Sequence, residues 1–244
     1  MRGVEPLAFD LQKVPHGAVH LETFSSTHFA REVECYVYTP PGYRNSGNRY
    51  PVLYLLHGGF MGPRVWTDLG AHRTADSLIA AGLAREIIIA MPDTGTDNRL
   101  GQPLPLTERY LLDEVIPFVE ANYRAGPVRY LAGLSRGAIH TRDIGLRNPE
   151  SFSALGIFSG GGFPAADPPL EQSYPKLLDA AAINERLQMI YIAVGNQDGA
   201  LANVERLRAS FERLGIKYRF NLSSGGHTTF NWQRYLPEFL KLLP

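Results

Sequence analysis

The chain has 244 residues, of which 44% are hydrophobic and 20% charged, and its 24 Lys and Arg balance its 24 Asp and Glu. This length and composition predict one globular domain over residues 1–244, and the zero net charge gives no general attraction to nucleic acid or anionic membranes. The single cysteine, Cys35, excludes an internal disulfide and a cysteine-based metal cluster.

The first predicted elements are two strands followed by a buried one. Residues 18–24 and 32–38 alternate apolar and polar side chains, which predicts two strands paired antiparallel at a sheet edge. The alternation also makes Cys35 a buried core residue rather than a catalytic thiol. Residues 51–56 form a continuous apolar run, typical of a strand covered on both faces, and end in His57-Gly58-Gly59.

From there, helices alternate with buried strands. We expect helices over 68–81, 107–123, 138–146, 201–214 and 230–243, and strands over 86–91, 128–134, 154–159, 188–194 and 217–222. Gly82 and Gly215 are placed to end two helices, and Pro117 should kink another. The alternation predicts an α/β fold, with a mostly parallel eight-stranded sheet, helices on both faces and an antiparallel N-terminal edge.

Ligands of such sheets bind at the carboxyl ends of the strands. The stretch 160–175 is rich in Pro and Gly and follows a strand's carboxyl end, so we expect it to form a loop over the site. Residues 1–17 precede the first strand and are expected to be a short extension of the domain.

A candidate nucleophile lies where the strand 128–134 ends, in Gly133-Leu134-Ser135-Arg136-Gly137. A strand that turns sharply into a helix around a serine exposes the hydroxyl, and the flanking glycines let neighbouring backbone approach. The pentapeptide alone is a weak signal because Gly and Ser are common. The motif becomes strong evidence for a nucleophile only if a base and an acid are found at the ends of other strands.

The candidate base is His227, which directly follows the last predicted strand. An acyl-transfer serine needs a base to take its proton and an acid to orient that base. Other histidines, such as His16 and His72, are expected to be ordinary surface residues. His227 differs from them because it lies between two glycines and a helix at a strand end.

The candidate acid is Asp198, which follows the strand 188–194 and precedes the base by one helix and one strand. Its alternative role is to cap the helix that begins near Leu201. Asp179 and Glu185 are weaker candidates because they come before that strand. The order serine, acid, histidine is the order of the α/β-hydrolases.

The oxyanion of the reaction needs backbone N–H donors. One candidate is the amide of Arg136, directly after the serine, and the other is that of Gly59, with Phe60 as second choice. One such donor contributes about 3 kcal/mol of transition-state stabilisation. The alternative for His57-Gly58-Gly59 is a plain tight turn, but its place after a strand favours the functional interpretation.

The whole chain from about Val19 resembles the putative-esterase family of the α/β-hydrolase superfamily, which includes feruloyl esterases, enterochelin esterases, esterase D-type enzymes and mycolyltransferases. The similar stretches are residues 37–43, 50–59 with Trp66, 78–93, 113–123, 133–137, 195–198 and 225–232. The resemblance implies that Ser135, Asp198 and His227 are the catalytic residues. It also implies oxyanion amides at Gly59 and Arg136.

One residue departs from the family pattern. The position after the serine is commonly Met, Gln or another neutral residue in the family, and here it is Arg136. Its amide can still serve the oxyanion. Its side chain either pairs with a carboxylate in a structural role or meets an anionic part of a substrate.

The substrate pocket is predicted less sharply. Phe60, Trp66, Phe163 and Trp232 lie in or beside loops that should surround the serine, although aromatic residues are more often core than ligand contacts. The family resemblance implies an aromatic residue near the acyl pocket at Trp66. Asp93, at a strand end, is expected to cap a helix or brace a loop. No metal or cofactor is expected, because the histidines and acids show no ligand spacing and the chemistry needs none.

These residues predict a serine carboxylic-ester hydrolase that acts through an acyl-enzyme on a small or aromatic ester, such as a feruloyl, siderophore or acetyl ester. An acyltransferase with the same triad is the alternative, and a non-catalytic binding protein on the same fold is the third hypothesis. The expected partner is a small-molecule ester, with no nucleic acid and no membrane, and a homo-oligomer stays open.

The N-terminal residues bear on the cellular compartment of the protein. They include Glu5 and Asp10 and lack the apolar core of a signal peptide, and no run in the sequence reaches the ~18 apolar residues of a membrane span. We therefore expect a cytoplasmic protein, or a secreted one if a signal peptide has been removed.

Overall fold

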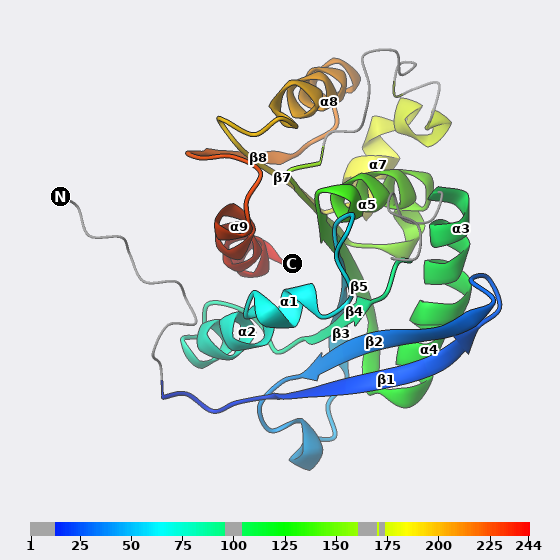
Figure 1. The fold of residues 1–244 in the computed structure, drawn as a ribbon. Helices are drawn as coiled ribbons and strands as arrows, with labels where there is room; N and C mark the ends of the chain where they lie inside the picture. The colour runs from blue at the N-terminus through cyan, green and yellow to red at the C-terminus, as the bar shows by residue number, and fades with distance from the viewer. Residues whose placement is uncertain (1–12, 96–103, 161–169, 171–173) are drawn as a thin grey trace.

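A computed structural model describes residues 13–95, 104–160, 170 and 174–244, and Figure 1 shows their arrangement. The strands form one 8-stranded sheet in the order β1-β2-β4-β3-β5-β6-β7-β8. Their bounds are β1 Ala18–Ser26, β2 Arg31–Thr39, β3 Tyr50–Leu56, β4 Ile88–Pro92, β5 Ala125–Leu134, β6 Ala154–Phe158, β7 Met189–Gly195 and β8 Arg219–Ser223.

The pairing of the strands follows the predicted pattern. β1 pairs antiparallel with β2, and β2 antiparallel with β4, whereas the pairs from β4 through β8 are all parallel. The predicted mostly parallel sheet with an antiparallel N-terminal edge is therefore confirmed. Because the parallel strands run in one direction, the segments that follow β3, β4, β5, β6, β7 and β8 all leave the sheet at the same edge.

Helices cover both faces of the sheet. They are α1 Val65–Asp68, α2 Ala71–Ala80, α3 Leu104–Arg109, the π-helix η2 Tyr110–Val115, α4 Ile116–Asn122, α5 Arg136–Arg147, α7 Ala180–Arg186, α8 Leu201–Leu214 and α9 Thr229–Leu242. Short 3₁₀ turns occur at η1 Tyr43–Asn45, η3 Pro149–Ser151 and η4 Pro175–Leu178.

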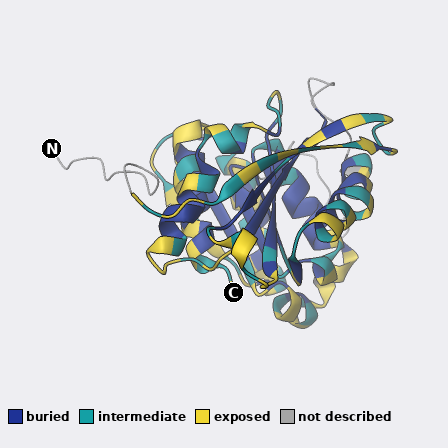
Figure 2. Ribbon diagram, turned by 90° about the horizontal axis from the view of Figure 1, so that it is seen from below, coloured by how far each residue is buried: buried dark blue, intermediate teal, exposed yellow. Residues whose placement is uncertain are grey.

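Each face has its own hydrophobic core. Along β3, Tyr54 and Leu56 belong to the core that includes side chains of α4, α5 and α8, whereas Leu53 and Leu55 belong to the core that includes side chains of α1, α2 and α9 on the opposite face. All four side chains are fully buried, and Figure 2 shows the central strands as the buried layer. Burial on both faces explains why this strand is a continuous apolar run.

Two predicted helices differ in the structure. The helix expected over 68–81 begins later, at Ala71 of α2, because Gly70 with a φ of 80° separates it from α1, which ends at Asp68. Gly82 (φ 67°) follows the end of α2 as predicted. The helix expected over 107–123 contains the π-helix η2, in which the Ile116 N–H donates to Leu111 O five residues earlier. Pro117 follows directly and cannot donate, so the interruption is a widened turn rather than a simple kink.

The predicted loop over 160–175 lies mostly outside the described residues. So does the beginning of the predicted extension 1–17, because the description starts at Lys13. The short helix α7, within 174–188, was not predicted.

Glu114 of η2 holds the turn between β1 and β2. Its carboxylate accepts hydrogen bonds from the Ser26 hydroxyl (2.5 Å), the Thr27 amide (2.8 Å) and hydroxyl, and the His28 amide (3.1 Å). The Ser26 hydroxyl oxygen also accepts from the Phe29 amide. One carboxylate therefore satisfies most of the donors at the tip of this hairpin.

The replacement Glu114→Gln tests this clamp. The neutral amide accepts weaker hydrogen bonds, so we expect the free energy of unfolding to fall by about 1–3 kcal/mol near pH 7. Burial raises the pKa of Glu114, but the hydrogen bonds from Ser26, Thr27 and His28 outweigh burial and lower it overall. A carboxylate with a lowered folded-state pKa stabilises above its unfolded pKa and loses that stabilisation as pH falls through the folded pKa.

The difference between wild type and Glu114→Gln in denaturant titrations should therefore begin to shrink below about pH 4, near the unfolded pKa, and should close below the lowered folded-state pKa. The control is Asp113→Asn: Asp113 is adjacent, its side chain is 59% exposed, and it contacts the turn only at the His28 ring, at 3.1 Å, a surface pair whose loss should cost no more than about 0.5 kcal/mol. Equal stability of Glu114→Gln and wild type near neutral pH would contradict the clamp.

Candidate active site

Ser135 occupies a strained turn between β5 and α5. Its φ of 53° and ψ of −116° are unusual for a residue with a side chain. The Ser135 N–H donates to Phe158 O at 2.8 Å, which fixes the turn to β6. Such strain persists only where surrounding contacts impose it, and it is concentrated at functional sites.

Neighbouring glycines allow the tight packing of this turn. A Cβ on Gly137 would lie 2.5 Å from His57 O, and a Cβ on Gly133 would lie 2.5 Å from the carbonyl of Gly137. Side chains at either position would force the backbone of β3, β5 and α5 apart. The close approach of backbone inferred from the pentapeptide is present around Ser135.

His227 joins Ser135 to Asp198. Its Nε2 lies 2.9 Å from Ser135 Oγ, and its Nδ1 lies 2.9 and 3.1 Å from the two carboxylate oxygens of Asp198. Because the carboxylate can only accept, Nδ1 carries the proton and the Nε2 lone pair faces the hydroxyl. The Asp198 side chain is fully buried and that of His227 is 40% exposed, so a reactant can approach the histidine but not the acid.

Asp198 also has the helix-capping contact considered as its alternative role. Its Oδ1 accepts the Ala200 N–H at 2.8 Å, just before α8. Burial raises the pKa of Asp198, but hydrogen bonds with His227, the Ala200 amide and Ser159 outweigh burial and lower it overall. Asp198 therefore remains a carboxylate at neutral pH, where it can stabilise an imidazolium.

Two asparagines that were not predicted as site residues hold the loops of the acid and the base: Asn196 joins the two loops, and Asn231 of α9 holds the base loop. Asn196 Oδ1 accepts the Gly225 N–H at 3.1 Å, and Asn231 Nδ2 of α9 donates to Gly226 O at 2.9 Å. Gln197 N–H also donates to Gly225 O at 2.9 Å. The sequence shows asparagines near Asp198 and His227, but it does not show what they contact. Asn196 and its partner Gly225, for example, are 29 residues apart.

The loop after β3 lies against the serine. A Cβ on Gly58 would lie 2.7 Å from Leu134 Cδ1 and 3.3 Å from Ser135 Cβ, whereas the nearest atom to one on Gly59 is Arg136 Cδ at 3.8 Å. Gly58 is therefore the glycine that close approach requires. Arg136 is the first residue of α5, so its backbone N–H points toward the N-terminal end of the helix.

Arg136 lies with its side chain alongside Gly59 and is half-buried. Burial lowers the pKa of its guanidinium, although an arginine stays charged at neutral pH. The choice between a structural and a substrate-binding role for this side chain stays a prediction.

Two aromatic residues expected at the substrate pocket are buried instead. Trp66 is fully buried and donates from Nε1 to Leu56 O at 3.0 Å. Trp232 is 3% exposed, donates from Nε1 to Ser159 Oγ at 3.1 Å, and places its ring 5.1 Å from the His227 ring, edge to face. As placed, both pack beneath the site rather than lining it, which corrects the expectation of substrate contact.

The other pocket and acid candidates have different outcomes. Phe60 is 78% exposed beside the loop, and Phe163 lies outside the described residues. Asp179 caps α7 by accepting the Ala182 N–H at 3.0 Å, and Glu185 lies within that helix. Neither acid is in the hydrogen-bond arrangement that His227 makes with Asp198.

Metal binding and membrane insertion were also considered over the described residues. In these ranges, no group of three or more His, Cys, Asp or Glu side chains is placed to hold a metal ion. Among the helices of the same ranges, none is both long enough and apolar enough to cross a bilayer.

Comparison with known proteins adds independent information. The model of the family described as "Putative esterase" matches residues 26–243. An endo-1,4-beta-xylanase/feruloyl esterase of Xylanibacter ruminicola is 31% identical over 94% of this chain and 32% of its own length. An esterase of Mycobacterium tuberculosis is 33% identical over 51% of this chain and 28% of its own length. The chain therefore spans about a third of the length of these curated relatives.

Solved structures support the fold. A ferulic acid esterase superposes with a TM-score of 0.81 at 25% identity, over 93% of this chain and 97% of its own. The feruloyl esterase module of Clostridium thermocellum, complexed with sinapinate, gives 0.83 at 18% identity, over 98% and 92% of the two chains. The predicted α/β-hydrolase fold is thereby confirmed.

The glycines of the loop provide a matched pair of variants. Gly58→Ala should push the loop away from Ser135 and lower kcat/KM by about 100-fold, because a small displacement of an aligned group is that costly. Gly59→Ala has room for its methyl group and should stay within about threefold of wild type. Equal losses in the two variants, measured by ester hydrolysis with thermal denaturation as a check of folding, would contradict this geometry.

Proposed function

The chain belongs to the "Putative esterase" family, and we propose that it is a serine carboxylic-ester hydrolase with Ser135 as nucleophile, His227 as base and Asp198 as orienting acid. The observation that supports the proposal best is the alignment of Ser135 Oγ, His227 and the buried Asp198 through contacts of 2.9 Å on each side of the imidazole. Family membership agrees with the resemblance inferred from the sequence.

The reaction proceeds in two halves. Ser135 Oγ attacks the ester carbonyl while His227 Nε2 takes its proton, and the imidazolium then protonates the leaving alcohol. Asp198 keeps Nδ1–H in place and stabilises the transient positive charge. Water, activated by the same histidine, then attacks the acyl-enzyme and releases the acid.

The oxyanion is assigned to the amides of Arg136 and Gly59. Arg136 follows the nucleophile at the N-terminus of α5, where N–H groups and the helix dipole favour negative charge. The loop 57–59 lies against Ser135 from the other side, as the approach of Gly58 to Ser135 Cβ indicates. The chemistry requires donors aimed at the oxygen that becomes negative, and these two amides are the proposed pair.

Esters of aromatic acids of the feruloyl type are the proposed substrates. This choice rests on two relatives, a xylanase/feruloyl esterase at 31% identity and a ferulic acid esterase at 25%. The exposed ring of Phe60, next to the proposed oxyanion loop, is available to pack against such an acyl group.

Replacement of the nucleophile tests the proposal. Ser135→Ala should lower kcat for p-nitrophenyl acetate by about 10⁴-fold or more, because the nucleophile and base act as one unit. His227→Ala should cause a comparable loss, and the double variant should be little worse than either alone. Unchanged hydrolysis by Ser135→Ala would overturn the assignment.

An ester panel tests the substrate class. Methyl ferulate should show a higher kcat/KM than methyl esters of aliphatic acids of similar size, because an aromatic ring gains more from stacking on Phe60. Phe60→Ala should reduce the preference. A panel in which aliphatic esters are preferred, with Phe60→Ala having no effect, would contradict the aromatic class while leaving the ester-hydrolase proposal intact.

A further inference from the structure

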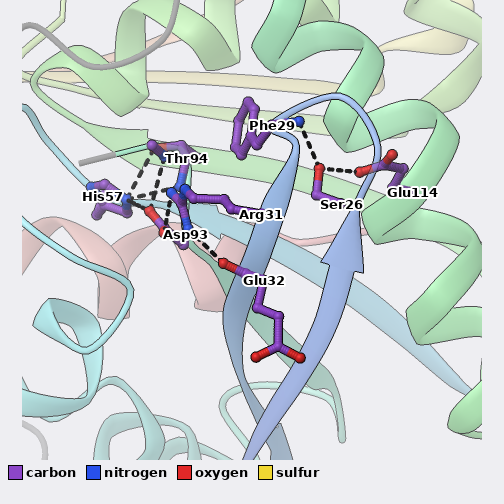
Figure 3. A network of polar contacts seen from close by, with 9 residues as sticks. Ser26, Phe29, Arg31, Glu32, His57, Asp93, Thr94 and Glu114 are labelled. Atoms are coloured by element: carbon purple, nitrogen blue, oxygen red, sulfur yellow. Dashed lines mark hydrogen bonds and ion pairs between the residues drawn. The ribbon is translucent and has the colours of Figure 1, made fainter. Parts of the chain in front are cut away.

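A network of buried polar groups lies behind the proposed oxyanion loop, and the mechanism above does not use it. His57 is 3% exposed and Asp93 is 6% exposed, and both lie at the carboxyl ends of neighbouring strands, β3 and β4. Figure 3 shows how Arg31 and Thr94 complete the network. Buried polar groups held in this way specify one local geometry.

The hydrogen bonds of His57 define its tautomer. The Thr94 N–H donates to Nε2 at 3.0 Å, so Nε2 must offer a lone pair. Nδ1 lies 2.8 Å from Gly58 O and therefore carries the proton and donates to it. Asp93 Oδ1, at 3.6 Å from Nε2, is beyond hydrogen-bond distance. The contacts fit a neutral imidazole rather than an ion pair with Asp93.

The bond to Gly58 O sets the direction of the proposed oxyanion donor. Gly58 O and the Gly59 N–H belong to one planar trans peptide, so they point in opposite directions. A peptide between two glycines is poorly constrained by sterics and can turn over easily. The hydrogen bond from His57 Nδ1 to Gly58 O fixes the orientation of this peptide, so the Gly59 N–H points away from His57.

Thr94 is itself held by Asp93 and Arg31. Asp93 Oδ1 accepts the Gly95 N–H at 2.9 Å, forming a turn around Thr94, and Oδ2 accepts from Arg31 at 2.8 Å. Burial raises the pKa of Asp93, but the hydrogen bonds from Arg31 and the Gly95 amide and the positive charge of Arg31 outweigh burial and lower it overall. The Asp93 carboxylate therefore stays charged in the folded protein near neutral pH.

Arg31 begins β2 and directly follows the β1–β2 turn. It also donates to Glu32 O at 2.8 Å, and the turn before it is clamped by Glu114. Figure 3 shows two groups of contacts, one around Glu114 at the turn and one that joins Arg31 to Asp93, Thr94 and His57, and the backbone of the hairpin connects them.

We propose that His57 is a positioning residue that aims the Gly59 amide at the oxyanion, and that Arg31 supports it through Asp93 and Thr94. The proposal rests on the assignment of Gly59 to the oxyanion hole in the proposed function. It predicts effects on the transition state rather than on the binding of substrate.

Two amide replacements separate the hydrogen bonds of His57. In His57→Asn the side-chain N–H can take the place of Nδ1–H and keep the bond to Gly58 O. In His57→Gln the longer side chain can reach the Nε2 position and keep only the Thr94 contact. We expect kcat to fall about 100-fold in His57→Gln and less than about tenfold in His57→Asn, with KM within about threefold in both.

An inhibitor that places an oxyanion in the site gives a second readout. A trifluoromethyl ketone forms a tetrahedral adduct with the serine, so its affinity should fall in parallel with kcat across wild type, His57→Asn and His57→Gln. Affinity for the carboxylic acid product should change little. Wild-type kcat and inhibitor affinity in folded His57→Gln, or equal losses in both variants, would overturn the role of the Gly58 bond.

The contribution of Arg31 is tested with a matched arginine. Arg31→Met should lower kcat and trifluoromethyl ketone affinity about 2- to 30-fold, the range for coupling through a packed network. Arg49→Met is the control, because Arg49 donates to Ala125 O at the opposite end of the sheet, and it should leave both values unchanged. A loss of thermal stability alone in Arg31→Met would show that Arg31 is merely structural.

Further measurements on wild type separate failure of the positioning role from misfolding of a variant and from failure of the proposed function. Nitrogen-15 NMR of wild-type protein labelled at histidine should show His57 as the neutral Nδ1–H tautomer, and a protonated Nε2 would overturn the proposal without any variant. If wild type neither hydrolyses esters nor binds the trifluoromethyl ketone, the proposed function fails. If it does both while the variants match it, only the positioning role fails.

Discussion

The arrangement of the site depends on the backbone at Ser135, which is held at a φ of 53° between β5 and α5. A serine has no intrinsic preference for this conformation, so the surrounding contacts must impose it. The hydrogen bond from Ser135 N–H to Phe158 O is one such contact. Gly133 and Gly137 have no side chains, so the neighbouring backbone can pack closely around the turn. Because the turn is fixed from several sides, the hydroxyl stays 2.9 Å from His227 Nε2.

The parallel sheet explains how distant segments reach this turn. β3, β5, β7 and β8 all end at one edge, and the segments after them bring the loop 57–59, Ser135, Asp198 and His227 together. Hydrogen bonds between buried polar groups then fix the positions of these loops relative to one another. Asn196 joins the acid and base loops, Asn231 holds the base loop against α9, and His57 joins the loop 57–59 to the segment after β4. The N-terminal hairpin, far from Ser135 in sequence, takes part through Arg31.

Much of this architecture was readable from the sequence. Continuous apolar runs marked the buried strands, and polar residues at strand ends marked Ser135, Asp198 and His227. Side-chain contacts were less predictable, because a period-two or helical pattern places a residue on a face but does not name its partner. Trp66 and Trp232 were expected near a substrate because they lie in or beside loops around the serine, and for Trp66 also from the family resemblance, but both are buried. The π-helix was also missed, since Pro117 signals an interruption but not its geometry.

The central claim is that the acyl group of an ester passes through Ser135. Reaction with excess methyl ferulate, quenched in acid during turnover and followed by peptide mass spectrometry, tests it most directly. The account predicts a feruloyl group on the peptide that contains Ser135 in wild type and none in Ser135→Ala. A wild-type protein that hydrolyses the ester while its acyl group appears on another residue would contradict the account.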